Sequence, residues 1–177
     1  MVQEYLSGGD LCAQLQALSH RNDRALAIFA QIVDAVAHVH SHGFVHNDIK
    51  ADNILLTKDG VPKLSDFGLA CTIGTPLDGA GTTKFMAPEL LTDHGKKEGV
   101  PADPSHDVWS LGVLLYTMLT GRFPWLRAVS TDEHFVFLQA TRFEDVDVKV
   151  SERNVCRFII MSSYYRLTPR CSCCVAC

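Results

Sequence analysis

The chain has 177 residues, 47% of them hydrophobic and 20% charged, which is enough for one well-packed soluble domain. Its net charge of −4 gives no reason to expect binding to nucleic acid or to an anionic membrane surface. The apolar run at 108–119 is too short to span a bilayer, and the residues after Met1 lack the cationic start and apolar core of a secretory signal. We therefore expect a cytoplasmic protein with no membrane span.

The N-terminal part predicts a short extended segment followed by a long helix. Residues 1–6 are partly apolar and stop at the break signal Ser7-Gly8-Gly9, after which Asp10 is suited to cap a helix. Residues 22–42 have the apolar periodicity of an amphipathic helix, which Gly43 should end. The expected buried stripe consists of Leu26, Phe29, Val33 and Val36, widened by Ala25, Ile28 and Ile32.

Histidines gather at the end of this helix, at positions 38, 40 and 42, with His46 just beyond. One interpretation is a metal site. The other is that imidazoles are simply favourable near a helix C-terminus. The second is preferred, because no Cys or carboxylate joins His38 and His42 at ligand spacing.

Further along the chain, the pattern predicts a hairpin, a loop and two buried helices. Residues 54–56 and 61–64 read as strands around the turn Lys58-Asp59-Gly60. Residues 92–105 are rich in glycine, proline and charge and predict a loop. Asp107 should then cap a helix over 108–119, which is apolar almost all round and ends at Gly121, and residues 154–165 predict another core helix.

Four short motifs carry the chemistry. They read HNDIKADN at 46–53, DFG at 66–68, APE at 87–89 and DVWSLG at 107–112. The carboxylate of Asp48 can orient a hydroxyl, and the ammonium of Lys50 can neutralise a phosphate. Asn53 and Asp66 can hold a divalent cation between two oxygen ligands.

Together and in this order, the motifs resemble the signature of protein kinases of the serine/threonine type. The resemblance covers residues 1–170 and implies a mainly α (α+β) fold, the C-terminal lobe of a kinase with small β-hairpins. The Gly-rich loop, strand lysine and helix glutamate of the N-terminal lobe are absent ahead of the hinge-like residues 1–6. Residues 171–177, with four cysteines, match no part of the family, and we expect a disordered tail; lipidation there is an open alternative.

The resemblance implies Mg²⁺-dependent transfer of the γ-phosphoryl group of ATP to serine or threonine in protein substrates. Asp48 would align the acceptor hydroxyl, Lys50 would stabilise charge on the transferred group, and Thr82 would hydrogen-bond both. Asn53 and Asp66 would hold the metal. His46 and Phe67 would stack on each other.

The same resemblance places the ATP site at the start of the chain. The Glu4 carbonyl and the Leu6 amide would meet the adenine edge, Leu55 would form the apolar floor and Asp10 would lie near the ribose. Helix capping explains Asp10 equally well, and Leu55 can also be a core residue of the hairpin.

Three positions depart from the family pattern. Asn47 replaces the usual arginine before the catalytic aspartate, Cys71 replaces a basic residue, and Asp78 stands where a phosphorylated residue is usual. Because those two cations normally hold the phosphate, we expect that phosphorylation at this site does not activate the protein. Glu89 would form a buried ion pair with Arg170.

Three hypotheses remain open at the level of sequence. The chain is a fragment of an active kinase, a naturally truncated and inactive lobe that binds proteins, or a product without function. The retained Asp48, Lys50, Asn53 and Asp66 favour the first, although the isolated chain should be inactive without the other lobe. Residues 125–140 resemble the corresponding region of SH3-binding-domain kinases and fungal nutrient-transporter-regulating kinases.

Overall fold

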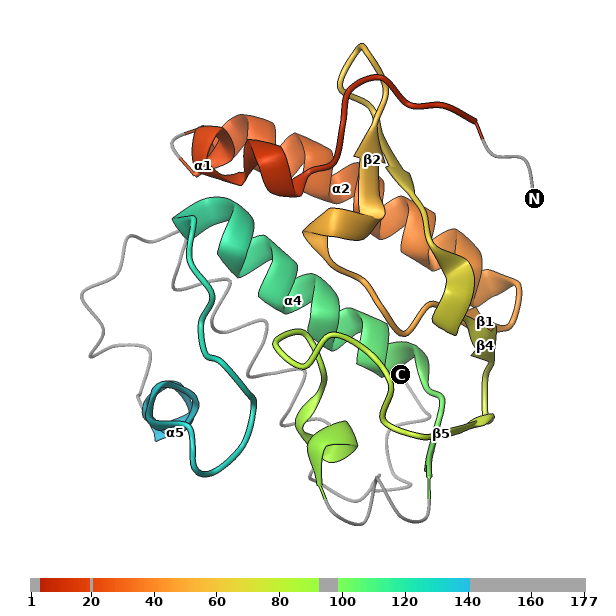
Figure 1. The fold of residues 1–177 in the computed structure, drawn as a ribbon, viewed down its shortest axis with the longest axis vertical. Helices are drawn as coiled ribbons and strands as arrows, with labels where there is room; N and C mark the ends of the chain where they lie inside the picture. Colours follow the sequence, from red (N-terminus) through yellow and green to blue (C-terminus); the bar gives the residue numbers. More distant parts are fainter. Residues whose placement is uncertain (1–3, 20, 93–98, 141–177) are drawn as a thin grey trace, which may run out of the picture.

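The computed structural model describes residues 4–19, 21–92 and 99–140. This part of the chain is mostly helical, with small antiparallel two-stranded sheets, as the sequence predicts (Figure 1). Its α-helices are α1 (Leu15–Leu18), α2 (Asn22–Ser41), α4 (Pro104–Thr120) and α5 (Glu133–Ala140). The helix expected at 154–165, the tail at 171–177 and Arg170 lie outside the described residues.

Helix α2 confirms the predicted amphipathic helix to within one residue. It ends at Ser41, and Gly43 follows with φ of 80°, a conformation that costs glycine little. Its buried residues are Ala25, Ile28, Ile32 and Val36. The expected centre of the stripe was wrong, because Leu26 and Val33 are 45% and 37% exposed. The apolar arc of this helix is wide, so periodicity alone does not tell which part of it meets α4.

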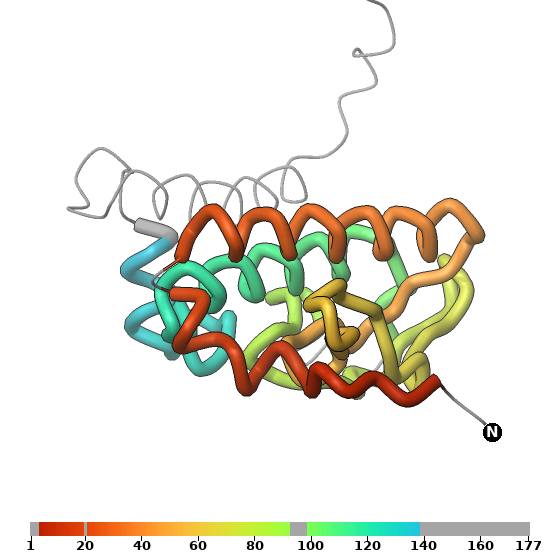
Figure 2. The backbone as a smooth tube through the Cα atoms, turned by 90° about the horizontal axis from the view of Figure 1, so that it is seen from above, coloured from red at the N-terminus to blue at the C-terminus, as the bar shows by residue number. Residues whose placement is uncertain are grey.

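Helix α4 is the central element of the core. It buries residues on every side, including Trp109, Leu114 and Met118, and it packs beside α2 (Figures 1 and 2). The helix begins at Pro104, four residues earlier than predicted, and Gly121 ends it with φ of 70°.

The predicted capping role of Asp107 was wrong. The N-cap is Asp103, whose Oδ1 accepts from the Ser105 amide at 2.9 Å, while its own amide donates to Nδ1 of His106 at 3.3 Å. Proline is well suited to the first helical turn, where its missing N–H leaves no bond unmade. Asp107 lies one turn inside the helix and is fully buried, so its carboxylate is available for other contacts.

Within the described ranges, the strands form three separate pairs. β2 (Ile54–Leu56) and β3 (Pro62–Leu64) make the predicted hairpin, with Ile54 opposite Leu64. β1 (Phe44–Val45) pairs with β4 (Cys71–Thr72), and β5 (Pro76–Leu77) pairs with β6 (Val100–Pro101). The pair β5–β6 was not predicted, because two-residue strands show no alternation.

These elements position the motif at 46–53. The segment leaves β1, passes over the N-terminal half of α4 and ends in the 3₁₀ turn η2 (Ala51–Asn53) ahead of β2 (Figure 1). The buried side chains of Ile49 and Ile54 fix it to the core.

Among the residues described, no helix combines the length and hydropathy needed to cross a bilayer.

Candidate active site

Asp48 is the centre of a hydrogen-bonded cluster. Its Oδ2 accepts from Lys50 Nζ at 2.6 Å and from Asn53 Nδ2 at 3.0 Å. Its Oδ1 accepts from Thr82 Oγ1 at 2.8 Å and from the Thr82 amide at 3.2 Å. Lys50 Nζ also donates to Thr82 Oγ1 at 2.9 Å. The structure therefore brings together the residues to which the sequence assigned catalytic roles, and it contains the hydrogen bonds expected of Thr82.

The surroundings of Asp48 keep it ionised. Burial by itself raises the pKa of this carboxyl, but hydrogen bonds from Lys50, Thr82 and Asn53 and the charge of Lys50 outweigh burial and lower the pKa below its ordinary value. At neutral pH the group is a carboxylate, ready to accept a hydrogen bond from a hydroxyl.

Asp107 fixes the backbone on which Asp48 stands. Its Oδ2 accepts from the His46 amide at 2.8 Å and from His40 Nε2 at 2.8 Å, and its Oδ1 accepts from the Asn47 amide at 2.9 Å. A fully buried carboxylate is stable only when its oxygens are satisfied, and these three donors do so. The core helix α4 thus holds the two residues before Asp48.

The two oxygen donors expected for a cation lie at adjoining ends of the β2–β3 hairpin. Asn53 precedes β2, Asp66 follows β3, and the Ser65 amide donates to the Asn53 carbonyl at 2.9 Å. The amide nitrogen of Asn53 donates to Asp48, so its carbonyl oxygen is turned away from that contact. Asp66 has φ of 57°, and its Oδ1 accepts from the Gly68 amide at 3.3 Å. One amide oxygen and one carboxylate are hard donors that fit Mg²⁺.

The four histidines at 38–46 contact different partners and do not converge on one point. The rings of His38 and His42 lie 4.3 Å apart, His40 contacts Asp107, and His46 stacks on Phe67 at 4.8 Å. In the described ranges, no cluster of three or more His, Cys, Asp or Glu is placed to hold a metal ion. The stack of His46 on Phe67 was predicted.

The residues expected to bind the nucleotide lie in the first segment of the chain and in the β2–β3 hairpin beside it. Residues 8–11 run along β2, with Asp10 opposite Leu55. A Cβ at Gly8 would overlap backbone oxygens of β2, so this close approach requires glycine. The N-cap of the 3₁₀ turn η1 (Cys12–Gln14) is Leu11 rather than Asp10, but Asp10 Oδ1 accepts from the Ala13 amide of that turn at 2.9 Å. The Glu4 side chain is exposed and bonds Lys63 at 2.6 Å, and Leu6 is half-buried.

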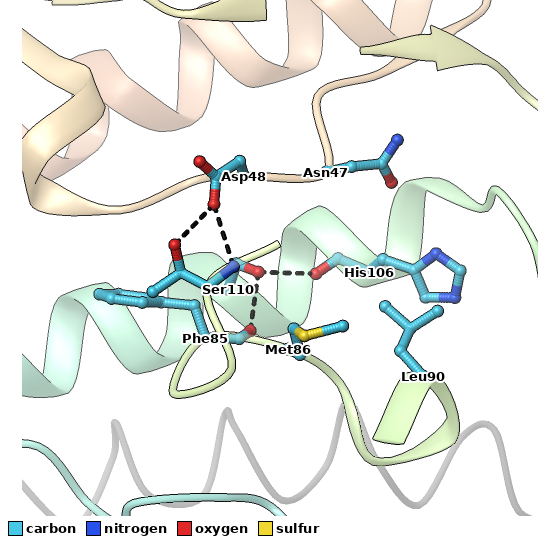
Figure 3. A pocket seen from close by; sticks show the side chains of 8 residues that line it. Asn47, Asp48, Phe85, Met86, Leu90, His106 and Ser110 are labelled. Carbon is cyan, nitrogen blue, oxygen red and sulfur yellow. Dashed lines mark hydrogen bonds between the residues drawn. The ribbon is translucent and has the colours of Figure 1, made fainter. Parts of the chain in front are cut away.

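Sequence reasoning missed the contacts that hold the segment before Ala87-Pro88-Glu89. Ser110 Oγ donates to the Phe85 carbonyl at 2.9 Å (Figure 3), and Trp125 Nε1 donates to the Lys84 carbonyl at 3.3 Å. Beside Asp48 lies a cavity of about 10 Å³, lined by Asn47 and His106 among others (Figure 3). Because Ser110 belongs to the DVWSLG motif, its position in the sequence could have indicated a role at the site. No feature of the sequence indicated the contact of Trp125.

The predicted partner of Glu89 lies outside the described residues, but one neighbour is visible. His106 Nε2 is 3.5 Å from Glu89 Oε1. Burial lowers the pKa of His106 despite the charges of Asp103 and Asp107, so the imidazole is neutral at pH 7.

The site combines a buried carboxylate brace, an aspartate–lysine–threonine cluster and the two oxygen donors Asn53 and Asp66. The protein kinase domain model matches residues 1–170 of the chain. The chain belongs to the protein kinase family.

The chain is similar to several serine/threonine-protein kinases. The chain is 39% identical to serine/threonine-protein kinase CHK1 of Saccharomyces cerevisiae, over 77% of this chain and 27% of that protein. It is 42% identical to AtPK1/AtPK6 of Arabidopsis thaliana, over 71% of this chain and 27% of that protein. It is 40% identical to SBK1 of Danio rerio, over 80% of this chain and 38% of that protein. The chain thus spans between about a quarter and two fifths of these relatives' lengths.

Proposed function

We propose that residues 1–170 form the hinge and large lobe of a serine/threonine protein kinase, which transfers the γ-phosphoryl group of ATP to hydroxyl groups of proteins in the cytoplasm. The observation that carries the proposal is the cluster in which Lys50, Asn53 and Thr82 all donate to the Asp48 carboxylate. The names of the relatives support the same chemistry.

In the proposed reaction, the acceptor hydroxyl donates a hydrogen bond to Asp48 and passes its proton there as the reaction proceeds. Its oxygen forms a bond to the γ-phosphorus while the bond from that phosphorus to the β–γ bridging oxygen breaks, so ADP leaves. Lys50 lies 2.6 Å from Asp48 and supplies a positive charge beside the transferred group. Thr82 holds both side chains in place.

Asn53 and Asp66 would hold Mg²⁺, which neutralises charge on the phosphates when it is bound. Their own role is to supply two oxygen ligands, of which Asn53 also donates to Asp48. The Glu4 carbonyl and the Leu6 amide would bind the adenine edge, with Leu55 beneath it and Asp10 near the ribose. Backbone groups suffice for the first two contacts, so the identity of those side chains is open to variation.

The alternative, a lobe that binds proteins without catalysis, is not favoured. A binding module has no need of an ionised Asp48 with three side-chain donors, nor of the oxygen pair Asn53 and Asp66. The Lys50–Thr82 bond holds the two donors together on the same carboxylate.

The test is phosphorylation of a serine/threonine peptide library by the full-length protein that contains this chain. Asp48→Asn should lower turnover by about 10²-fold or more, since a positioned base contributes about 10²–10⁴-fold. Asp66→Asn should abolish transfer through loss of the metal. The matched control is Asp59→Asn, an exposed carboxylate in the hairpin turn. Unchanged turnover in Asp66→Asn would contradict the proposal.

A further inference from the structure

Asn47 has an uncommon backbone conformation immediately before Asp48. Its φ is 65°, in the left-handed region that most residues avoid and that asparagine tolerates better than others. Its amide donates to the buried Asp107, so this conformation is fixed from the core side.

The side chain of Asn47 reaches across to another segment. Its Nδ2 donates to the Leu69 carbonyl at 3.0 Å and to Cys71 Sγ at 3.2 Å. The amide cannot be turned over, because Oδ1 would then face the Leu69 carbonyl oxygen. As placed, Oδ1 is buried beside the small cavity and has no hydrogen-bond partner among the described residues (Figure 3). Burying Oδ1 without a hydrogen bond costs free energy, which the hydrogen bonds of Nδ2 offset.

The bonded residues lie just after the proposed metal ligand. Leu69 ends the 3₁₀ turn η3 (Phe67–Leu69), which begins directly after Asp66, and Cys71 begins β4. Residues on both sides of Ala70 are therefore tied to the loop at 46–53. The pairing of Val45 with Cys71 and the bond from the Ile73 amide to the Gly43 carbonyl, at 3.0 Å, extend this connection.

We propose that Asn47 is a positioning residue that fastens the segment after Asp66 to the catalytic loop in the unmodified protein. It acts through the Leu69 carbonyl, which limits how far the backbone at Asp66 can move relative to Asp48. This inference rests on the proposed kinase function for its catalytic consequence, but the fastening is a property of the fold. It gives the segment order without any bound phosphate.

The variants separate the backbone effect from the side-chain effect. Asn47→Gly keeps the positive φ and removes the amide, and Asn47→Asp keeps the shape but replaces the donor with an acceptor. Cys71→Ala removes only the weak sulfur acceptor and leaves the bond to Leu69. Val36→Ala removes a buried side chain of α2 that makes no bond to Asn47, and it controls for general destabilisation.

The first readout is hydrogen–deuterium exchange of the full-length protein without nucleotide or Mg²⁺. We expect the amides of residues 70–73 to exchange about tenfold faster in Asn47→Gly and Asn47→Asp, the scale of one lost hydrogen bond. Cys71→Ala should change them less than about twofold on the same scale. Equal exchange in wild type and both Asn47 variants would overturn the proposal.

The second readout is steady-state kinetics. In both Asn47 variants kcat should fall about tenfold and the Mg²⁺ concentration for half-maximal rate should rise, with KM for the peptide unchanged. Val36→Ala should lower the unfolding temperature and leave the Mg²⁺ dependence as in wild type. If the exchange changes but kcat and the Mg²⁺ dependence do not, Asn47 is only structural and the positioning role is wrong. A wild type without transferase activity refutes the proposed function, while exchange still tests the fastening.

Discussion

The brace between Asp107 and the catalytic loop yields a quantitative prediction for stability. Replacing Asp107 by Ala leaves the amide of the fully buried His46 and the amide of the half-buried Asn47 without their acceptor. At about 1–3 kcal/mol for each orphaned donor, the free energy of unfolding should fall by about 2–6 kcal/mol.

His40→Ala is the matched control for this perturbation. It removes the third bond to Asp107 but leaves both backbone amides paired, and His40 is 18% exposed, so water can replace it. The expected loss is about 0.5–1.5 kcal/mol, the net value of one hydrogen bond.

Urea unfolding of wild type and both variants, followed by circular dichroism, measures the difference. With a slope of about 2 kcal/mol per molar urea, Asp107→Ala should lower the midpoint by about 1–3 M. The slope itself should not change, because the same surface is exposed on unfolding. If Asp107→Ala shifts the midpoint no more than His40→Ala does, the backbone bonds do not stabilise the loop and the reasoning is refuted.

Three further predictions concern the site and its surroundings. Thr82→Ala should lower kcat about tenfold, on the scale of one hydrogen bond to a charged group, whereas Thr82→Ser keeps the hydroxyl and should retain most activity. Folding lowers the pKa of Asp48, so wild type should be more stable than Asp48→Asn by its full margin well above the ordinary pKa of 3.8. Unfolding curves measured at acid pH should show this difference in stability shrinking as the pH falls below 3.8 toward the lowered pKa. Asp132→Ala removes the acceptor for the amides of Leu126, Arg127 and Phe135 and should cost about 1 kcal/mol in thermal unfolding, against no change in Glu133→Gln.

Patterns over a few neighbouring residues predicted the elements that are determined by interactions between near neighbours in the sequence. The helix at 22–42 and the hairpin around Asp59 appear as expected, because apolar periodicity and turn residues act over a few positions. The start of α4 was mispredicted for the opposite reason. Asp107 is a good capping residue by type, but its partners His46 and Asn47 are about sixty positions away in sequence, and the actual cap at Asp103 precedes a proline.

The site was predictable where residue type implies a role and unpredictable where a backbone atom is the partner. Asp48, Lys50 and Thr82 come together as the family pattern implies. The contact of Asn47 with the Leu69 carbonyl has no sequence signature, since any residue supplies a carbonyl. The sequence showed that the usual arginine was replaced, but only the structure shows what the asparagine contacts.

Two main-chain carbonyls of the segment before Ala87-Pro88-Glu89 accept hydrogen bonds from side chains of the core. Ser110 and Trp125 bind the carbonyls of Phe85 and Lys84, so the anchoring does not depend on the side chain of Lys84, which lies instead over the Phe123 ring. Phe85 and Met86 are also buried in the core, so it is the more exposed side chains of this segment that can change while its path stays the same. Under the proposed function, acceptor preference can therefore diverge between close relatives without any change in the position of Asp48.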